Sequence, residues 1–346
     1  MDSLTQIALG SAVTLATMGR RTAAWKAVLW GAIAGTLPDL DAFIDHGNAI
    51  ANMVQHRAES HALLYLTLLA VPLGALVARL HGDMHQWRRW CLALWLALIT
   101  HPLLDWMTVY GTQLLKPFTD YPFGVGSIFI IDPLYTVPLL IGVVAALALR
   151  GPRGLRWNAW ALAFSGVYLA WSVGAQQYVT GVAMASLQTQ GVQAERVLVT
   201  PAPFNTLLWR VVAVTPTEYF EGFYALADGK RPMQWTRHTR GADLLARYAQ
   251  QPSVQSVARF SHGFLRMQQD ARGHVFVTDL RMGQEPSYSF HFDLGPADAL
   301  ANGGATITQQ WQRPDIATAL PALWRRMWGH GGGDGPFGAN MAKTAL

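Results

Sequence analysis

The sequence predicts an all-α membrane bundle of about five or six transmembrane helices, followed by a soluble α+β domain with an antiparallel sheet. Three observations support this fold class. The 346 residues are 51% hydrophobic and only 14% charged, whereas soluble domains carry about 25% charged residues. Apolar segments close to the length of a membrane span recur through the first half of the chain. After about residue 176, short segments with alternating apolar residues replace them.

The expected transmembrane domain covers residues 1–175. Its helices are expected at residues 4–18, 24–44, 61–80, 90–107, 129–149 and 157–175. Basic residues gather in the loops that follow the first, third and fifth of these segments: Arg20, Arg21, Lys26, Arg79, Arg88, Arg89, Arg150, Arg153 and Arg156. The positive-inside rule places such loops in the cytoplasm. The loops 45–60 and 108–128, and everything after residue 175, are therefore expected to face outward.

The outward-facing domain is expected over residues 176–328, with a disordered tail over 329–346. Strands are expected at residues 194–200, 209–215, 273–282 and 287–294, and a short helix at 241–251. Residues 315–328 form an amphipathic pattern with Leu320, Leu323 and Trp324 on one side. This helix either docks on the outer domain, which we favour, or lies on the membrane surface.

Composition also excludes several classes of protein. The single cysteine, Cys91, rules out a disulfide scaffold and a thiolate metal site. The sequence pI is about 9.5, yet no basic cluster alternates with aromatic residues, so no nucleic-acid partner is expected. The histidines after residue 176 show no ligand spacing.

Acids and histidines gather at the outer ends of the expected spans. These residues are Gln6, Asp39, Asp41, His56, Arg57, Ser60, His61, His101, Asp105, Ser127 and Asp132. A charged group within a span costs at least ~2.5–3.5 kcal/mol on insertion scales. A divalent metal ion, which binds carboxylate and neutral imidazole, would compensate several such groups at one depth.

The spacing of these residues favours a metal site. His101 and Asp105 are four residues apart and share a helical face. His56 and His61 flank a junction between a loop and a helix, so both could be ligands. Asp39 and Asp41 are two apart, so one is expected as a ligand and the other as a supporting group. Mixed histidine and aspartate ligation suits zinc best, with manganese as the alternative.

Each of these residues also has a purely structural interpretation. A single histidine near a membrane interface is more often hydrogen-bonded than a metal ligand. Asp39 and Asp41 could cap a helix or pair with Arg57. Asp132 precedes Pro133 and is better explained as the N-cap of the fifth helix than as a ligand.

An ordered set of motifs resembles the membrane-bound metal-dependent hydrolase family, the YdjM/YbcI-like inner-membrane proteins. The motifs are MDSLTQIALGSAV at the start, GAIAGTLPDLDAFI at 31–44, HRAESH at 56–61, THPLLDWMTVYGTQLLKPF at 100–118 and GSIFIIDPLYTVPLL at 126–140. The resemblance covers residues 1 to about 150 and implies a multi-pass protein of the bacterial inner membrane. It also implies a distant similarity to zinc-dependent phospholipase C.

The resemblance implies metal ligands at Asp39, His61, His101 and Asp105, with His56 as a further candidate. Two positions depart from the family pattern. Many relatives have Thr-His near the amino terminus where this chain has Thr5-Gln6, and Gln6 could offer only a carbonyl oxygen. The HR-x-x-T-H-S element appears here with Ser60 in place of threonine.

The leading hypothesis is metal-dependent hydrolysis of an ester or phosphoester in a membrane lipid or lipid-linked substrate at the outer face of the membrane. Asp41, if Asp39 is the metal ligand, would be the general base. Arg57 would hold an anionic group. The alternative is a non-catalytic membrane protein with a structural metal site, whose outer domain binds an envelope partner. An ion-coupled transporter is least favoured, because the inner halves of the spans carry almost no polar residues.

Overall fold

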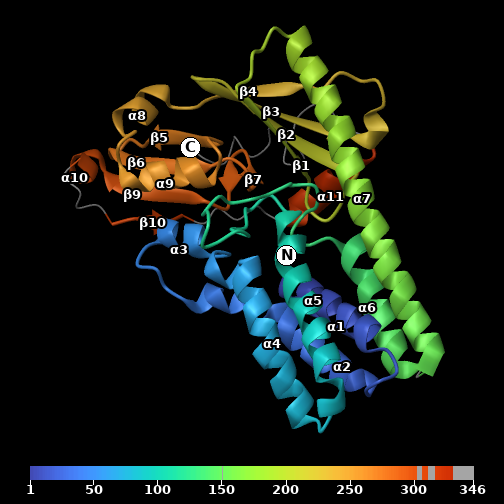
Figure 1. Ribbon diagram of the computed structural model, residues 1–346. Coiled ribbons are helices and arrows are strands. Elements are labelled where there is room, and N and C mark those ends of the chain that lie inside the picture. The colour runs from blue at the N-terminus through green and yellow to red at the C-terminus, as the bar shows by residue number, and fades with distance from the viewer. Residues whose placement is uncertain (150, 302–305, 311–315, 330–346) are drawn as a thin grey trace. The chain divides into compact units, whose positions relative to one another are not determined.

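The computed structural model describes residues 1–149, 151–301, 306–310 and 316–329. The chain divides into two compact units (Figure 1). The helical unit comprises Met1–Asp45, Gln55–Val173 and Pro203–Asn205, and the α/β unit comprises His46–Val54, Gly174–Ala202 and Thr206–Leu346. A helical N-terminal region followed by a domain with antiparallel sheets was the predicted order, and this part of the prediction is confirmed.

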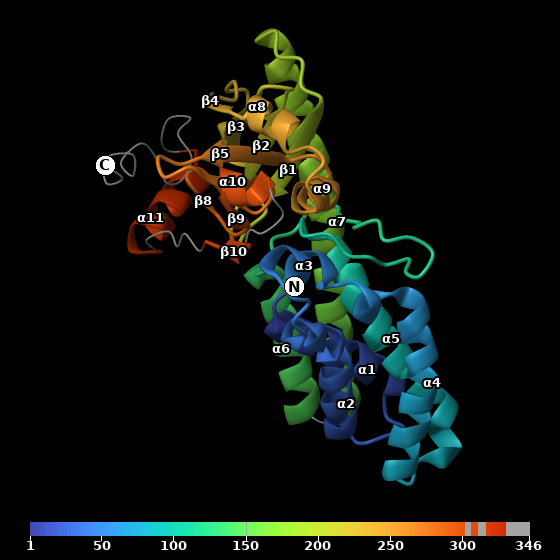
Figure 2. The ribbon, with the colours of Figure 1, turned by 90° about the vertical axis from the view of Figure 1, so that its left-hand side faces the viewer.

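Five helices and the first part of a sixth build the helical unit. They are α1 (Ser3–Met18), α2 (Ala24–Thr36), α4 (Leu63–Leu80), α5 (Trp87–Trp106), α6 (Pro133–Ala148) and the beginning of α7 (Gly151–Thr189), with short 3₁₀ turns η1 (Pro38–Phe43), η2 (Glu59–His61) and η3 (Met84–Gln86). Helix α1 is central, because it contacts α2, α5 and α6, and α4 packs against α5 (Figures 1 and 2).

Glycines bring α1 and α2 into backbone contact. A Cβ on Gly10 would lie 2.2 Å from the Gly31 carbonyl oxygen, and one on Gly35 would lie 2.4 Å from the Gln6 carbonyl oxygen. Real Cβ atoms essentially never approach another atom so closely, so this crossing requires glycine. Gly31 and Gly35 are four residues apart, a spacing that lets helix backbones approach closely, and the contact fixes Gly35 beside Gln6.

Several helices of this unit carry apolar side chains on their outer surfaces. On α4 the exposed residues include Leu68, Val71 and Leu76, and on α6 they include Ile141 and Val144. Among the described residues, α4 is the one helix long and apolar enough to cross a membrane. Helices α1 and α6 are apolar but have only 16 residues each. The expected bundle of five or six spans is therefore only partly supported.

Two expected helices have different bounds in the structure. The apolar segment 24–44 does not form one helix: α2 ends at Thr36, and Pro38 starts the 3₁₀ turn η1. Pro38 has no N–H to donate to the preceding turn, which favours the change from α-helix to 3₁₀ turn at this position. The expected helix at 157–175 extends in both directions, because α7 has 39 residues and continues into the α/β unit.

The α/β unit holds two four-stranded antiparallel sheets and a two-stranded one. Their strand orders are β1-β2-β3-β4, β10-β9-β6-β5 and β7-β8. The strands are β1 (Arg196–Pro201), β2 (Leu208–Val214), β3 (Glu218–Ala225), β4 (Trp235–Thr239), β5 (Leu265–Gln269), β6 (His274–Asp279), β7 (Gly283–Gln284), β8 (Ser287–Tyr288), β9 (His291–Pro296) and β10 (Thr308–Gln309). The helices are α3 (Ala49–Gln55), α8 (Ala242–Arg247), α9 (Pro252–Phe260), α10 (Ala297–Ala301) and α11 (Ile316–Met327), with the 3₁₀ turn η4 (Leu226–Asp228).

Helices cover the sheets of this unit. The end of α7 packs Val179 and Ala183 against Trp209 and Val211 of the first sheet. Helices α8 and α9 contact β5 and β6 of the second sheet (Figure 1). Each of the four predicted strands coincides with a strand, although 287–294 is divided between β8 and β9. The predicted tail lies outside the described residues, apart from Gly329.

A buried charged pair lies between β2 and β3. The Arg210 Nε donates to Glu221 Oε1 over 2.6 Å, its Nη1 donates to the Leu280 carbonyl oxygen over 2.8 Å, and its Nη2 donates to the Tyr288 hydroxyl over 3.2 Å. Both charged side chains are at most 6% exposed. The arginine thereby ties the first sheet to the segment that leads into β7 and β8.

Candidate metal centre

The change from α-helix to 3₁₀ turn at Pro38 sets the direction of two aspartates. In a 3₁₀ helix, residues two apart lie on different sides. Asp39 accordingly contacts His61 and His101, whereas Asp41 contacts His56 and the backbone of Arg57. The sequence predicted different roles for the two aspartates, and their contacts differ.

Histidine 61 is presented by a tight turn between α3 and α4. Arg57 adopts a left-handed backbone conformation with φ of 64°, and its N–H donates to Asp41 Oδ2 over 2.9 Å. The turn η2 follows and ends at His61. Asp41 therefore ties this turn to η1, which holds His61 opposite α5.

Four side chains from η1, η2 and α5 converge. They are Asp39, His61, His101 and Asp105, and one ligand atom of each lies within 4.8 Å of all the others. This group could hold a metal ion, and it is the one such group of three or more potential ligands among the described residues. His61, His101 and Asp105 are fully buried, and Asp39 is 19% exposed.

The separations within this group match those of a tetrahedral site. The two Nε2 atoms of His61 and His101 are 3.1 Å apart. Each of them lies 3.4 Å from Asp39 Oδ1, and 3.2 Å and 3.3 Å respectively from Asp105 Oδ2. A tetrahedron with zinc–ligand bonds of about 2.0–2.2 Å has edges of about 3.3–3.6 Å. Five of the six edges are thus close to the size that zinc requires.

Hydrogen bonds at the far side of each imidazole fix which nitrogen carries the proton. The Gly35 carbonyl oxygen lies 2.6 Å from His101 Nδ1 and can only accept, so that nitrogen donates. The Ser60 hydroxyl donates to Asp41, so its oxygen accepts from His61 Nδ1 over 2.8 Å. Both rings therefore turn Nε2 toward the centre, which is the nitrogen through which an imidazole with a protonated Nδ1 ligates a metal.

Asp105 is oriented by contacts to its other oxygen. Gln6 Nε2 donates to Asp105 Oδ1 over 3.1 Å, and the nitrogen of Met1 also contacts this oxygen. Asp105 Oδ2 and Asp39 Oδ1 are buried and have no hydrogen-bond partner. Two imidazole nitrogens hence face these two carboxylate oxygens at 3.2–3.4 Å, a distance at which all four atoms could share one cation.

Asp41 forms a second polar group next to these four ligands. It accepts from His56 Nδ1 over 2.8 Å, from the Arg57 N–H and from the Ser60 hydroxyl. Burial by itself would raise the pKa of Asp41, but hydrogen bonds from His56, His61 and Ser60 hold that pKa well below its ordinary value. Asp41 is consequently an ionised acceptor that orients its neighbours.

The remaining predicted residues lie in different places. His56 is not among the four converging side chains, because its ring contacts Asp41 and is 26% exposed. Asp132 caps α6 through the N–H groups of Leu134 and Tyr135. Ser127 accepts from the Ser172 hydroxyl over 3.1 Å.

Three contributors were missed by sequence reasoning. The Gly35 carbonyl oxygen orients His101, and the Thr108 hydroxyl accepts from Arg57 Nη1 over 3.3 Å. The third is Tyr110, whose ring lies 4.9 Å below the Arg57 guanidinium carbon. A signal existed only for Thr108, which follows His101 and Asp105 at helical spacing. A backbone carbonyl has no signature in a sequence.

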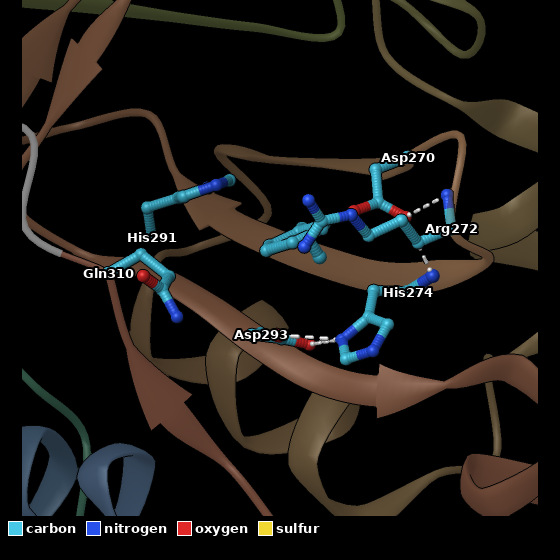
Figure 3. Close-up of a pocket in the computed structure, with 7 residues that line it drawn as sticks. Asp270, Arg272, His274, His291, Asp293 and Gln310 are labelled. Carbon is cyan, nitrogen blue, oxygen red and sulfur yellow. Dashed lines mark hydrogen bonds and ion pairs between the residues drawn. The ribbon is translucent and has the colours of Figure 1, made fainter.

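A pocket in the α/β unit lies on the second sheet, with a volume of about 380 Å³ (Figure 3). Its lining residues are Asp270, Arg272, His274, Phe276, His291, Asp293 and Gln310. His274 Nδ1 pairs with both oxygens of Asp293, at 2.9 Å and 3.1 Å. Burial and the Arg266 guanidinium lower the pKa of His291.

Comparison with known proteins connects the helical unit to a family. The uncharacterized protein YfhP of Bacillus subtilis (strain 168) is 27% identical over 168 residues, which are 47% of this chain and 50% of YfhP. The chain thus spans about half the length of this curated relative. No solved structure matches the chain. Residues 1–179, which include all four converging side chains, match the family described as YdjM inner membrane protein. Because this match covers more than half of the sequence, the chain belongs to the YdjM inner membrane protein family.

Proposed function

We propose that this chain is a multi-pass, metal-dependent hydrolase of the bacterial inner membrane. Its substrate would be an ester or phosphoester in an amphiphilic molecule, a membrane lipid or lipid-linked compound, at the outer face of the membrane. The domain after residue 176 would lie on that same side. One observation carries the proposal: one potential ligand atom from each of Asp39, His61, His101 and Asp105 lies within 4.8 Å of the other three.

A divalent cation fits this set of donors. The carboxylates of Asp39 and Asp105 supply two negative charges, and the Nδ1 contacts of His61 and His101 leave Nε2 as the ligating nitrogen of each ring. Nitrogen and oxygen ligands at tetrahedral spacing favour zinc, with manganese as the alternative. When bound, such an ion supplies Lewis-acid polarisation of a substrate oxygen and activation of water.

Arg57 is proposed to hold the anionic part of the substrate. Its side chain is 7% exposed, and its Nε lies 3.4 Å from Asp105 Oδ2. Contacts with Thr108 and Tyr110 fix the guanidinium, while Nε makes no hydrogen bond. The guanidinium thus lies next to the metal ligands, and this position is the reason for assigning it to a phosphate or ester oxygen.

Proton transfer is assigned to the pair of Asp41 and His56. Asp41 accepts three hydrogen bonds and its pKa is lowered, so its carboxylate is a weak base. His56 donates through Nδ1 to Asp41, and its ring centroid lies 6.1 Å from that of His61. An aspartate in this position orients a histidine and stabilises its charged form. Asp41 would thus support catalysis by holding the His56 ring in a fixed orientation.

Metal content and hydrolysis should be measured on the full chain purified in detergent. We expect stoichiometric zinc or manganese in the wild type and its loss in His101→Ala. The matched control is His85→Ala, because His85 is exposed in η3 and outside the cluster. Hydrolysis of a fluorescent phospholipid in mixed micelles should follow metal content. Equal, negligible metal in all three proteins would overturn the proposal.

A structural metal site is the second candidate function, with the α/β unit binding an envelope partner. The observation in its favour is that three of the four ligands are fully buried, and structural sites are closed. In that case His101→Ala should lower the melting temperature strongly, and the metal-loaded wild type should hydrolyse no ester or phosphoester.

A further inference from the structure

Helix α11 has two different faces, and one of them is firmly attached to the α/β unit. Leu323 and Met327 pack with Leu208 and Phe223 in a hydrophobic cluster. Arg326, which is buried, donates to both oxygens of Asp228 over 3.0 Å and 2.7 Å and to the Phe223 carbonyl oxygen over 2.9 Å. These contacts confirm that α11 docks on this unit, as the sequence favoured. The predicted apolar side is nevertheless divided, because Leu323 is buried here and Leu320 and Trp324 are exposed.

The other face of α11 is apolar and exposed. Leu320, Trp324 and Trp328 are 46%, 61% and 49% exposed. They are four residues apart, which aligns them on one side of a helix. The two indole rings meet edge to face at 5.7 Å, and Arg325 beside them is exposed. We call these four residues the outer face of α11.

Exposed apolar side chains are concentrated on this face. Among the described residues of the α/β unit, the other large hydrophobic side chains that are exposed are Tyr178 and Met184 of α7. Isolated exposed apolar residues need no explanation, but a contiguous group marks an interaction site. The outer face of α11 is therefore a candidate interaction surface.

We propose that the outer face of α11 docks on the surface of a lipid bilayer and inserts its tryptophans among the headgroups. Tryptophan is enriched at the boundary between a membrane and water. Helices that lie in this boundary combine Trp and Leu on one face with basic residues that attract anionic lipids, as Trp324, Leu320 and Arg325 do. The chain belongs to an inner-membrane family, so a bilayer is present where the protein functions.

The size of the face favours lipid over a second copy of the chain. A fully buried tryptophan contributes about 150–250 Å², so two half-exposed indoles and one leucine offer only about 300 Å². A stable protein interface needs about 800 Å² on each partner. A narrow apolar stripe suffices for docking on a membrane, where the rest of the chain already provides attachment.

The face of α11 that carries Leu323 and Arg326 is already attached to the α/β unit, so docking on a membrane would order few additional residues. The buried ion pair of Arg326 with Asp228 and the packing of Leu323 already hold α11 as a helix. No segment has to be ordered when Trp324 and Trp328 enter the headgroup layer, and ordering is one of the main costs of association.

Spin labels on the full chain in nanodiscs of phosphatidylethanolamine and phosphatidylglycerol test this proposal. The label is placed by Trp324→Cys in a background with Cys91→Ala, since Cys91 is the only cysteine. Ala246→Cys on α8, an exposed position of the same unit, is the matched control. The measured quantity is the ratio of the label's collision frequency with oxygen to its collision frequency with a water-soluble nickel complex. We expect this ratio to be several-fold higher at position 324 than at position 246.

The possible results separate the occupants. Equal ratios at positions 324 and 246 would overturn the proposal, because the face would then lie in water. Dipolar broadening between labels at position 324 without the oxygen excess would overturn it in favour of a second copy. A label introduced by Leu320→Cys repeats the measurement if the first variant does not fold. Loss of metal or hydrolytic activity does not enter this readout, so the test is independent of the proposed function.

Discussion

Replacing Gly35 with alanine tests whether the contact between α1 and α2 holds the metal ligands in place. The new Cβ would lie 2.4 Å from the Gln6 carbonyl oxygen, and relief to an ordinary contact of about 3.4 Å requires the two helices to separate by about 1 Å. The Gly35 carbonyl moves with α2. Its hydrogen bond from His101 Nδ1, now 2.6 Å, would then lengthen to about 3.6 Å, where no hydrogen bond remains.

Two effects of different size should follow from Gly35→Ala. Overpacking at a close contact costs about 1–3 kcal/mol of stability. Loss of the group that orients a ligating histidine costs about 10–100-fold in metal affinity. Affinity is measured by competition with a chromogenic zinc chelator on the full chain in detergent, and stability by the melting temperature from near-UV circular dichroism.

A matched substitution isolates the effect of the contact. Gly166 lies within α7 and a Cβ there would meet no atom within 4 Å, so Gly166→Ala should leave the zinc affinity unchanged. If Gly35→Ala lowers the melting temperature but binds zinc with wild-type affinity, then the Gly35 carbonyl does not orient His101 and the reasoning is wrong.

Three further predictions follow from contacts described above. Ser60→Ala removes the hydroxyl between Asp41 and His61 Nδ1 and should weaken zinc binding by about 10–100-fold in the same competition assay. Arg57→Lys loses the planar guanidinium over Tyr110, so phosphodiester hydrolysis should fall while the zinc content by mass spectrometry stays at the wild-type level. Arg210→Met leaves Glu221 as an unpaired buried charge and should destabilise the α/β unit by about 3–5 kcal/mol in chemical denaturation, with unchanged zinc content.

Hydropathy was sufficient to predict that a helical region precedes a domain with antiparallel sheets, but it did not predict where the helices end. The segment 24–44 is apolar throughout, so its break at Pro38 depends on a backbone effect that hydropathy does not measure. Strand β3 was missed because its sequence, EYFEGFYA, places charged glutamates among aromatic residues. Glu221 is buried there only because Arg210 on β2 neutralises it, and a cross-strand pair is invisible without the fold.

The sequence predicted the candidate ligands themselves, but it did not predict the contacts that orient them. Histidine and aspartate at helical spacing identified His101 and Asp105, and the structure places both in the cluster. The partner of His56 could not be predicted, because the direction of Asp41 depends on the 3₁₀ turn that follows Pro38. Likewise the role of Gln6 as a donor to Asp105 depends on the glycine contact between α1 and α2.

The unequal burial of the four ligands has a kinetic consequence. His61, His101 and Asp105 are enclosed, and Asp39 alone among the four reaches solvent, on a short 3₁₀ turn. An ion bound there would meet solvent on the side of Asp39, and we expect local opening of this turn to limit its loading and exchange. A chelator in large excess should strip the ion slowly and with a rate independent of chelator concentration, and Asp39→Ala should convert this slow release into rapid exchange.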